Sequence, residues 1–232
     1  MAIWWIFSIP FLWIIVTTIG SFHIRWNYFL KATHHNYNTT KNTIAITFDD
    51  GPNPEFTPKA LELLQKYNAK ATFFCIGKNV EKHPEIIQKI IAKGHQIGNH
   101  SYAHSNNYGF LSTKKIIADI SKAQERIKKV TKTENLLFRP PFGVTNPNIA
   151  KAIKIVQLQP IGWSIRSYDT IAKEPKKVLK KIISKLKKGD IILLHDTSIL
   201  SILVLEQLLR WLQENNIESV SINQLLKSNT NA

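Results

Sequence analysis

From residue 43 onward, the chain alternates short apolar runs with longer stretches in which apolar residues recur at helical spacing. The short runs are rich in β-branched and aromatic residues, which predicts strands covered on both faces. They occupy residues 43–48, 70–77, 95–98, 135–139, 156–163, 190–196 and 217–222. The longer stretches predict amphipathic helices over residues 57–68, 83–94, 112–130, 174–189 and 201–216. This alternation predicts an α/β fold with a parallel sheet, and about seven repeats favour a barrel over an open sheet.

The N-terminal residues follow a different pattern. Residues 2–22 carry no charged side chain, and this run matches the roughly 20 residues that a membrane-spanning helix needs. A cleavable signal peptide is disfavoured, because no basic residue precedes the apolar run. We therefore predict four segments along the chain. They are a single-pass transmembrane anchor over 1–24, a polar linker over 25–42, a folded domain over 43–226 and a disordered tail over 227–232.

Charge bears on the orientation of this anchor and on the partners of the domain. Arg25, Lys31 and Lys41 follow the apolar run and no Lys or Arg precedes it, so the positive-inside rule predicts a cytoplasmic domain. The extracytoplasmic orientation stays open, since a large folded domain can outweigh three charges. The chain has 31 Lys and Arg residues against 16 Asp and Glu, a net charge of +15. A basic surface suits nucleic acid, an anionic membrane or an acidic polymer, and charge alone does not choose among them.

Reactive side chains follow several of the predicted strands, where the active sites of parallel barrels lie. The four stretches are "TFDDGP", "GNHSYAH", "FRPPFG" and "ILLHD". His100 and His104 are four residues apart, a spacing that brings two imidazoles to one side of a helical turn. With Asp50 they would form the three-ligand set of an open hydrolytic metal site. The alternative for the two histidines is a pair on a helix surface.

The two adjacent aspartates then take different roles. Asp50, bound to a divalent cation, would stay ionised, while Asp49 beside it could accept a proton from an attacking water. A tight turn after the strand lets both carboxylates reach one cavity, which regular strand alternation would prevent. His195, at the end of a strongly apolar strand, is a candidate for the group that protonates a leaving group.

In this order and at these intervals, the four motifs resemble the signature motifs of the polysaccharide deacetylases, carbohydrate esterase family 4. The resemblance covers residues 43–226 and implies a deformed (β/α) barrel that removes N- or O-acetyl groups from sugars with a divalent metal, usually zinc and sometimes cobalt or nickel. It assigns Asp49 as the general base and His195 as the catalytic acid. The implied metal ligands are Asp50, His100 and His104.

Four further residues take roles from the same resemblance. Arg139 corresponds to the arginine that fixes the base through a charge-assisted hydrogen bond. The backbone N–H of Phe142 would help to stabilise the oxyanion, and Leu194 would line a small apolar pocket for the acetyl methyl group. Asp169 matches the aspartate that orients the catalytic histidine.

One motif departs from the family pattern. Where many relatives have D-x-x-D-W, this chain reads "WSIRSYDT", with Arg166 in place of the first aspartate and Thr170 in place of the tryptophan. The acid machinery is therefore expected to be intact, while the substrate groove is altered. An arginine that faces the site favours an anionic sugar, phosphate or carboxylate, and an arginine that pairs with a local acid has a structural role only.

The sequence thus predicts a membrane-anchored, metal-dependent deacetylase, with N-acetyl groups as the foremost target. Peptidoglycan, chitin-like oligomers, a surface polysaccharide and a lipid-linked sugar all remain candidate substrates. The alternative function is that of a catalytically silent glycan-binding protein of the same fold. A nucleic-acid binder is not expected, since no recognition motif accompanies the positive charge.

Overall fold

The computed structural model describes the backbone of residues 3–227 and the side chains of residues 8–227. Its sheet is parallel in every strand pair. The strands are β1 (Thr43–Asp49), β2 (Ala71–Cys75), β3 (Gln96–Asn99), β4 (Leu137–Phe138), β5 (Gln159–Pro160), β6 (Ile165–Arg166), β7 (Ile191–His195) and β8 (Glu218–Ser219). Seven of them follow the order β5-β4-β3-β2-β1-β7-β6, and β8 pairs with the start of β1.

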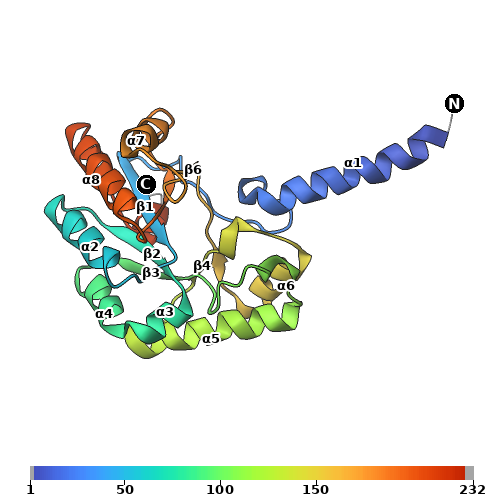
Figure 1. Ribbon diagram of the computed structural model, residues 1–232, viewed down its shortest axis with the longest axis horizontal. Coiled ribbons are helices and arrows are strands. Elements are labelled where there is room, and N and C mark those ends of the chain that lie inside the picture. The colour runs from blue at the N-terminus through green and yellow to red at the C-terminus, as the bar shows by residue number, and fades with distance from the viewer. Residues whose placement is uncertain (1–2, 228–232) are drawn as a thin grey trace.

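The predicted α/β fold with about seven parallel strands is confirmed, but the barrel is incomplete. Within residues 3–227, β5 and β6 form the two ends of the strand order and are not paired with each other. The sheet curves around the centre of the molecule, and most helices lie outside it (Figure 1). The longer helices are α2 (Phe56–Lys66), α4 (Pro84–Ala92), α5 (Thr113–Thr131), α6 (Pro147–Val156), α7 (Pro175–Ile183) and α8 (Ile199–Glu214); the short ones are α3 (Gly77–Lys82) and α9 (Ile222–Lys227).

Alternation along β1 separates two faces of the sheet. Ile46 and Phe48 belong to a large apolar cluster with side chains of α2, α4, α7 and α8, so they face these helices. Ala45 lies in a second cluster with Leu193 and Trp163 on the other, inner face. The side chains of Thr47 and Asp49 share that inner face by the same alternation. The polar residues of the four motifs therefore meet on the concave side of the sheet.

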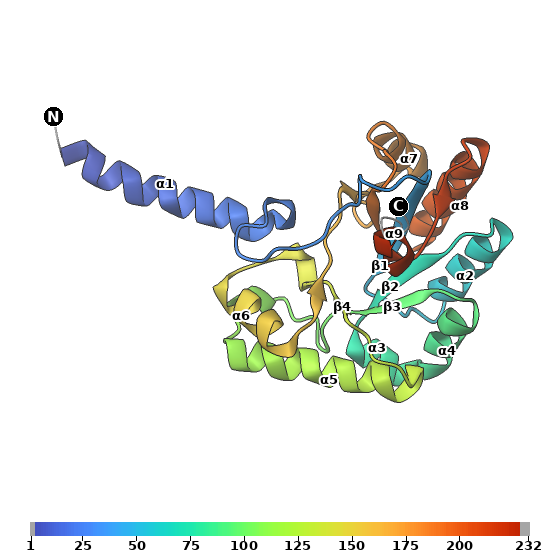
Figure 2. The same ribbon diagram turned by 180° about the vertical axis from the view of Figure 1, so that it is seen from behind.

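The N-terminal helix α1 (Ile3–Phe22) extends away from the rest of the molecule, as both views show (Figures 1 and 2). Its last turn is attached to the body, because the backbone N–H of Thr145 donates to the carbonyl oxygen of Ser21 at 2.8 Å. Over its described residues, the structure contains no helix that combines the length and the apolar character required to cross a membrane. The predicted transmembrane anchor over 1–24 thus finds no support, and the side of a membrane on which the domain lies stays a prediction.

The predicted linker over 25–42 packs against the sheet. Leu30 and Ala32 are buried, and Thr33 forms a parallel bridge with Ile161, next to β5. Further along, the N–H of Asn36 donates to the carbonyl oxygen of Gly189 at 2.7 Å. This segment is therefore part of the folded body. Of the predicted tail over 227–232, only Lys227 is among the described residues, and it ends α9.

Candidate active site

The three predicted metal ligands meet at the carboxyl ends of β1 and β3. Asp50 directly follows β1, and His100 directly follows β3. His104 reaches the same place through an irregular loop, in which the hydroxyl of Ser101 accepts a hydrogen bond from the N–H of His104 at 3.0 Å. Ser101 and His104 both have positive φ angles, 64° and 47°. The expected helical turn between the histidines is therefore wrong, although the pairing of their side chains is right.

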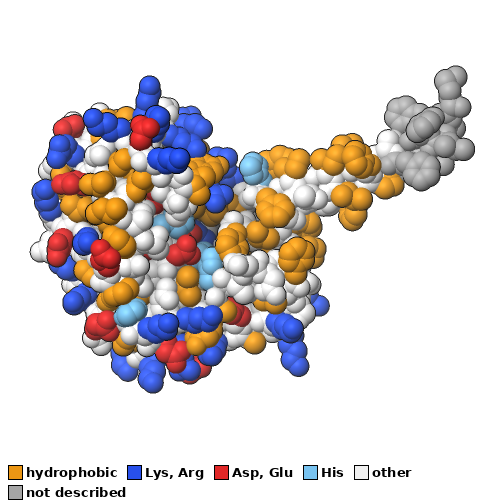
Figure 3. All heavy atoms as spheres, viewed as in Figure 1, with side chains coloured by type: hydrophobic (Ala, Val, Ile, Leu, Met, Phe, Trp, Pro, Cys, Tyr) orange, Lys and Arg blue, Asp and Glu red, His pale blue; other side chains and the backbone are white. Residues whose placement is uncertain are grey.

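The geometry of these three side chains suits a cation. The Nε2 atoms of His100 and His104 lie 3.5 and 3.3 Å from Oδ1 of Asp50. The three ligand atoms all fall within 4.8 Å of one another. Oδ1 of Asp50 is buried and has no hydrogen-bond partner among the described residues, a costly state unless a ligand satisfies it. Histidine and acidic side chains also gather near the middle of the face shown in Figure 3, inside a rim rich in lysine and arginine.

Electrostatics prepare the same residues for metal binding. Nδ1 of His100 lies 2.8 Å from the carbonyl oxygen of Arg139, which fixes the tautomer with Nδ1 protonated and Nε2 free to coordinate. Burial alone would raise the pKa of Asp50, but the nearby imidazoles of His100, His104 and His195 hold that pKa well below its usual range. Burial lowers the pKa of His104, which favours the neutral imidazole that binds metals. Asp49 and Asp50 raise the pKa of His100 although burial opposes this, so His100 would lose a proton when it binds a metal. Asp50 and His104 can bind without a change of protonation.

Asp49 is held beside this triad by Arg139. Nη1 of Arg139 donates to Oδ1 of Asp49 at 2.7 Å, and both side chains are buried. The other carboxylate oxygen of Asp49 lies 3.8 Å from Nε2 of His100. One oxygen is therefore fixed by the guanidinium, and the other points toward the metal ligands. This is the arrangement that the resemblance implied for a general base.

Arg139 is fully buried and uses its other donors on the backbone. Its Nε and Nη2 groups donate to the carbonyl oxygens of Ile161 and Gly162 at 3.2 and 2.8 Å. Nη1 also donates to the hydroxyl of Thr47 at 2.7 Å, and the guanidinium lies 4.1 Å from the centre of the Phe74 ring. A buried charge is tolerated only when it is paired and hydrogen-bonded in this way. Thr47 is a residue of the site that the sequence analysis did not identify.

His195 also lies near Asp50 and is oriented by Asp169. Nδ1 of His195 is 2.9 Å from Oδ1 of Asp169, and the backbone N–H of His195 donates to Oδ2 at 2.9 Å. Nε2 of His195 is 3.9 Å from Oδ2 of Asp50 and thus faces the metal triad. Burial lowers the pKa of His195, but the bond to Asp169 outweighs it and raises that pKa above its ordinary value.

Two serines complete this arrangement, and neither was identified from the sequence. The hydroxyls of Ser167 and Ser201 donate to Oδ1 and Oδ2 of Asp169 at 2.6 and 2.7 Å. These bonds, together with His195, hold the pKa of Asp169 below its ordinary value even though burial opposes this. Ser201 lies on α8, more than thirty residues from Asp169 along the chain, so no local pattern pointed to it.

Leu194 and Phe142 are the two residues predicted to line the substrate pocket. Leu194 is fully buried in the cluster beneath the helices, on the face of β7 opposite to His195. The prediction that it lines the acetyl pocket is therefore not matched by its position, and Leu193 is the leucine that shares the inner face with His195. The ring of Phe142 lies against His104, with 4.5 Å between ring centroids, and its φ angle is 60°. The oxyanion role of its backbone N–H stays a prediction.

A buried carboxyl lies behind the paired aspartates. Asp196 is fully buried and accepts a hydrogen bond from the hydroxyl of Thr57, which itself accepts one from the N–H of Asn53 at 2.7 Å. A Cβ atom on Gly51 would lie 2.7 Å from its carboxylate oxygens, so only glycine fits at this position of the turn. Burial, the largest cause, raises the pKa of Asp196 to about 7. Asp196 therefore supports the turn that presents Asp49 and Asp50.

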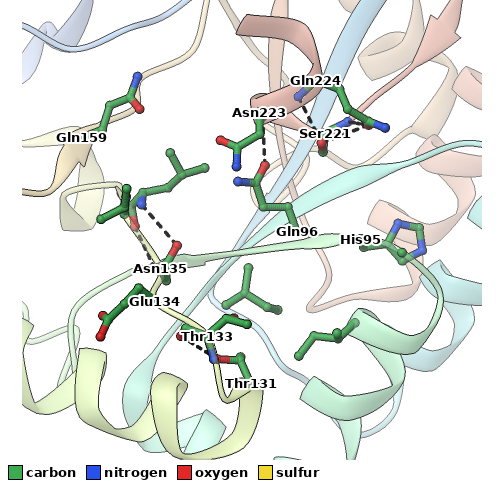
Figure 4. A pocket seen from close by; sticks show the side chains of 15 residues that line it. His95, Gln96, Thr131, Thr133, Glu134, Asn135, Gln159, Ser221, Asn223 and Gln224 are labelled. Carbon is green, nitrogen blue, oxygen red and sulfur yellow. Dashed lines mark hydrogen bonds between the residues drawn. The ribbon is translucent and has the colours of Figure 1, made fainter. Parts of the chain in front are cut away.

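A separate cavity, of about 440 Å³, lies at the amino end of β3 and near β5, away from these residues (Figure 4). Its lining is rich in amide side chains, among them Gln96, Asn223 and Gln224, which approach one another in the close view. The one histidine in it, His95, has a pKa lowered to about 4 by burial and by two nearby lysines. This cavity holds none of the residues of the four motifs.

Comparison with known proteins decides the family. The sequence model of the polysaccharide deacetylase family matches residues 36–161. The chain belongs to the polysaccharide deacetylase family. A peptidoglycan-N-acetylglucosamine deacetylase of Bacillus cereus is 36% identical over 192 residues, which cover 79% of this chain and 88% of that protein. Several other curated relatives are longer, and the chain spans 39% of their length.

Solved structures of this polysaccharide deacetylase family agree with the fold. The peptidoglycan deacetylase PdaC from Bacillus subtilis is 29% identical, with a TM-score of 0.77 over 84% of this chain and 94% of that one. A protein described as a carbohydrate esterase family 4 pseudoenzyme, from Bacillus anthracis, is 27% identical, with a TM-score of 0.78 over 85% of this chain and 69% of that one. The family thus contains both enzymes and at least one protein described as inactive.

Proposed function

We propose that this deacetylase is metal-dependent and removes acetyl groups, N-acetyl groups foremost, from a glycan of the peptidoglycan or chitooligosaccharide type. The observation that carries the proposal is the arrangement around Asp50. Its buried Oδ1 lies near two imidazole nitrogens, the carboxylate of Asp49 lies near one of these imidazoles, and Nε2 of His195 lies near its other oxygen. A base, an acid and three ligands converge on one point, which is what hydrolysis of an acetamide requires.

The residues that would hold the metal are Asp50, His100 and His104. A divalent cation bound there, with zinc as the first choice for a mixed nitrogen and oxygen ligand set, would supply a Lewis acid for the acetyl carbonyl. Three protein ligands leave a position open for water or substrate. Cobalt and nickel accept the same donors, so the donor set favours no more than this group of metals.

The chain's own residues supply the proton transfers. Asp49 would accept a proton from the attacking water through the oxygen that Arg139 does not engage. His195 would deliver a proton from Nε2 to the departing amine, since its Nδ1 is occupied by Asp169. Asp169 keeps the imidazole in this tautomer and favours its charged form. The backbone N–H of Phe142 would stabilise negative charge on the carbonyl oxygen.

The choice of substrate class rests on the relatives. The Bacillus cereus relative is named as a deacetylase of N-acetylglucosamine in peptidoglycan, and another relative as a chitooligosaccharide deacetylase. Both substrates carry acetamido sugars in a β-linked chain. We therefore propose a glycan of this kind as the substrate.

Acetate release from peptidoglycan fragments and from chitin oligomers, with and without added zinc, tests the proposal. Asp49→Asn is expected to lower the rate by at least about 100-fold, because it removes the base. The variant should bind zinc like the wild type, whereas Asp50→Asn should lose zinc affinity as well as activity. Lys176→Gln, at an exposed position of α7, is the control and should match the wild type.

The competing function is a silent glycan-binding protein, and the similarity to a family pseudoenzyme gives it a concrete precedent. Wild-type protein that binds zinc and retains chitin oligomers but releases no acetate would favour that function and overturn the proposal. Full activity of Asp49→Asn would overturn the assigned base.

A further inference from the structure

A small cavity with a strongly basic lining lies along the edge strand β6. We call it the basic cavity. It has a volume of about 180 Å³, and its charged lining residues are Arg25, Arg166, Lys181 and Lys185. Trp163 and Tyr168 provide its aromatic walls. No acidic residue lines it, and these four cations take part in none of the ion pairs found among residues 8–227.

The four cations come from separate parts of the chain. Arg25 belongs to the short helical turn after α1 and donates from Nη1 to the carbonyl oxygen of Ser164 at 3.0 Å. Arg166 comes from β6, and Lys181 and Lys185 from the last turn of α7 and just beyond it. Lys181 and Lys185 are four residues apart, so they lie on the same side of the helix, and two arginines from other elements line the same cavity. The fold, rather than a local run of charge, therefore produces this concentration.

Aromatic rings fix two of these cations in place. The guanidinium of Arg166 lies 5.0 Å from the centre of the Tyr168 ring and 5.7 Å from that of Trp163. Nζ of Lys181 lies 3.5 Å from the centre of the same Tyr168 ring. Such contacts partly offset the repulsion between like charges. An anion between them would offset it further, since planar guanidinium groups bind carboxylate and phosphate through paired hydrogen bonds.

The basic cavity is close to the catalytic residues, because Arg166 lies on β6 and His195 on the neighbouring strand β7. Ile165 packs with the helix-side cluster, so the side chain of Arg166 turns to the inner face that also carries His195. Arg166 pairs with Leu193, two residues before His195. In an ordinary parallel sheet this places the Cα atoms of Arg166 and His195 about 8 Å apart. The loop after Arg166 continues directly to Asp169, which orients His195.

We propose that the basic cavity is a subsite for an anionic substituent, a carboxylate or a phosphate, on a sugar next to the one that is deacetylated. This inference rests on the proposed function, since it assigns the cavity to the same substrate. The cavity is too small for a sugar chain but large enough for one charged group. Because Arg166 lies only two residues away from His195 in strand register, one glycan could place its acetamido group at Asp50 and its anionic group at Arg166. The enzyme should therefore prefer anionic glycans over neutral ones.

The test compares kcat/KM for acetate release from three matched tetrasaccharides. One is a neutral chitin tetramer, one is a peptidoglycan tetramer in which muramic acid supplies carboxylates, and one is a chitin tetramer carrying a phosphate. We expect the wild type to prefer an anionic substrate, with a preference that weakens as salt is added. Arg166→Gln should reduce the ratio of anionic to neutral kcat/KM by about tenfold or more. The anionic substrate that loses more identifies the group as carboxylate or phosphate.

Two further variants separate loss of charge from loss of fold. Lys181→Gln should lower the same ratio, and Arg166→Lys, which keeps the charge, should retain more of it than Arg166→Gln. Lys176→Gln removes a charge from the same helix outside the cavity and should keep the wild-type ratio. An unchanged ratio in both Arg166→Gln and Lys181→Gln overturns the inference. If these two variants lose binding to phosphatidylglycerol vesicles but keep the wild-type ratio of anionic to neutral kcat/KM, the inference is also overturned, because the cavity then binds a lipid surface.

Direct binding keeps this test independent of catalysis. Titration of the protein with N-acetylmuramic acid and with N-acetylglucosamine, followed by NMR or calorimetry, reports the subsite even where no acetate is released. Tighter binding of the acid by the wild type and Lys176→Gln than by Arg166→Gln supports the subsite. Equal binding of both sugars by all three proteins overturns it. Failure of acetate release alone would count against the proposed function and not against the subsite.

Discussion

At the scale of single residues, the four aspartates in and beside the site differ in the groups that surround their carboxylates. Asp49 is tied to a guanidinium, Asp50 to imidazoles, and Asp169 to hydroxyls and His195. Asp196 has a single hydroxyl donor and complete burial. The first three arrangements stabilise a charged carboxylate, and the last penalises it. Four carboxyl groups close to one another in the fold thus meet four different electrostatic environments.

The bond between Asp169 and His195 predicts a change in pH dependence. Asp169→Asn removes the carboxylate that raises the pKa of His195, so burial should then bring that pKa down. Because the acid must be protonated, the alkaline limb of the kcat profile should move to lower pH. Acetate release near neutral pH should fall on the order of 100-fold. A profile measured with saturating zinc that keeps its alkaline limb in Asp169→Asn would contradict this role.

The buried carboxyl of Asp196 predicts a stability change. Its pKa is raised from an ordinary value near 3.8 to about 7, so the folded state binds the proton more tightly than the unfolded state. Its contribution to stability is therefore complete below about pH 4 and is lost as pH rises to about 7, at a cost of up to about 4 kcal/mol. Asp196→Asn, which cannot ionise, should be more stable than the wild type at pH 8 and close to it at pH 4. Melting temperatures of both proteins across this range measure the difference, and parallel curves would refute it.

At the scale of elements, the long helix α5 and the first strand were predicted well, whereas the two-residue strand β6 and helix α6 were missed. The stretch 112–130 matches α5, and 43–48 matches β1 to within one residue. Strand β6 has only two residues, too few for any alternation to show. Helix α6 was not predicted, although Asn146 and Pro147 form a clear start signal for it. Its last residue, Val156, was assigned to the apolar run of the next strand instead.

The contribution of Asn146, the residue that caps α6, to the free energy of unfolding can be measured. Oδ1 of Asn146 accepts a hydrogen bond from the N–H of Ile149 at 2.9 Å, and its amide donates to the carbonyl oxygen of Gly109. Asn146→Ala removes both bonds and should lower the free energy of unfolding by about 1–2 kcal/mol. Urea denaturation provides the measurement. Lys151→Ala, at an exposed position of the same helix, is the control and should change stability by less than about 0.5 kcal/mol.

At the scale of the whole molecule, the motifs predicted the site better than the pattern predicted the fold. The order of Asp49, Asp50, His100, Arg139 and His195 along the chain fixed which strand ends had to meet, and the structure brings them together. The residues that position these side chains could not be predicted from the sequence. Thr47 and Ser201 act through partners distant in sequence, and a serine or threonine carries no signal of its own. The loop conformation between His100 and His104 also depends on tertiary contacts rather than on their spacing.

The buried guanidinium of Arg139 has a consequence for how this protein loses activity. Arg139 directly follows β4 and binds Asp49 of β1 and the backbone after β5, so the group that holds the base also connects neighbouring strands. A partly opened sheet would leave Asp49 without its partner and an unpaired charge in the interior. Inactivation and melting should therefore be a single event, and the activity that remains in a warming sample should report directly how many molecules are still intact.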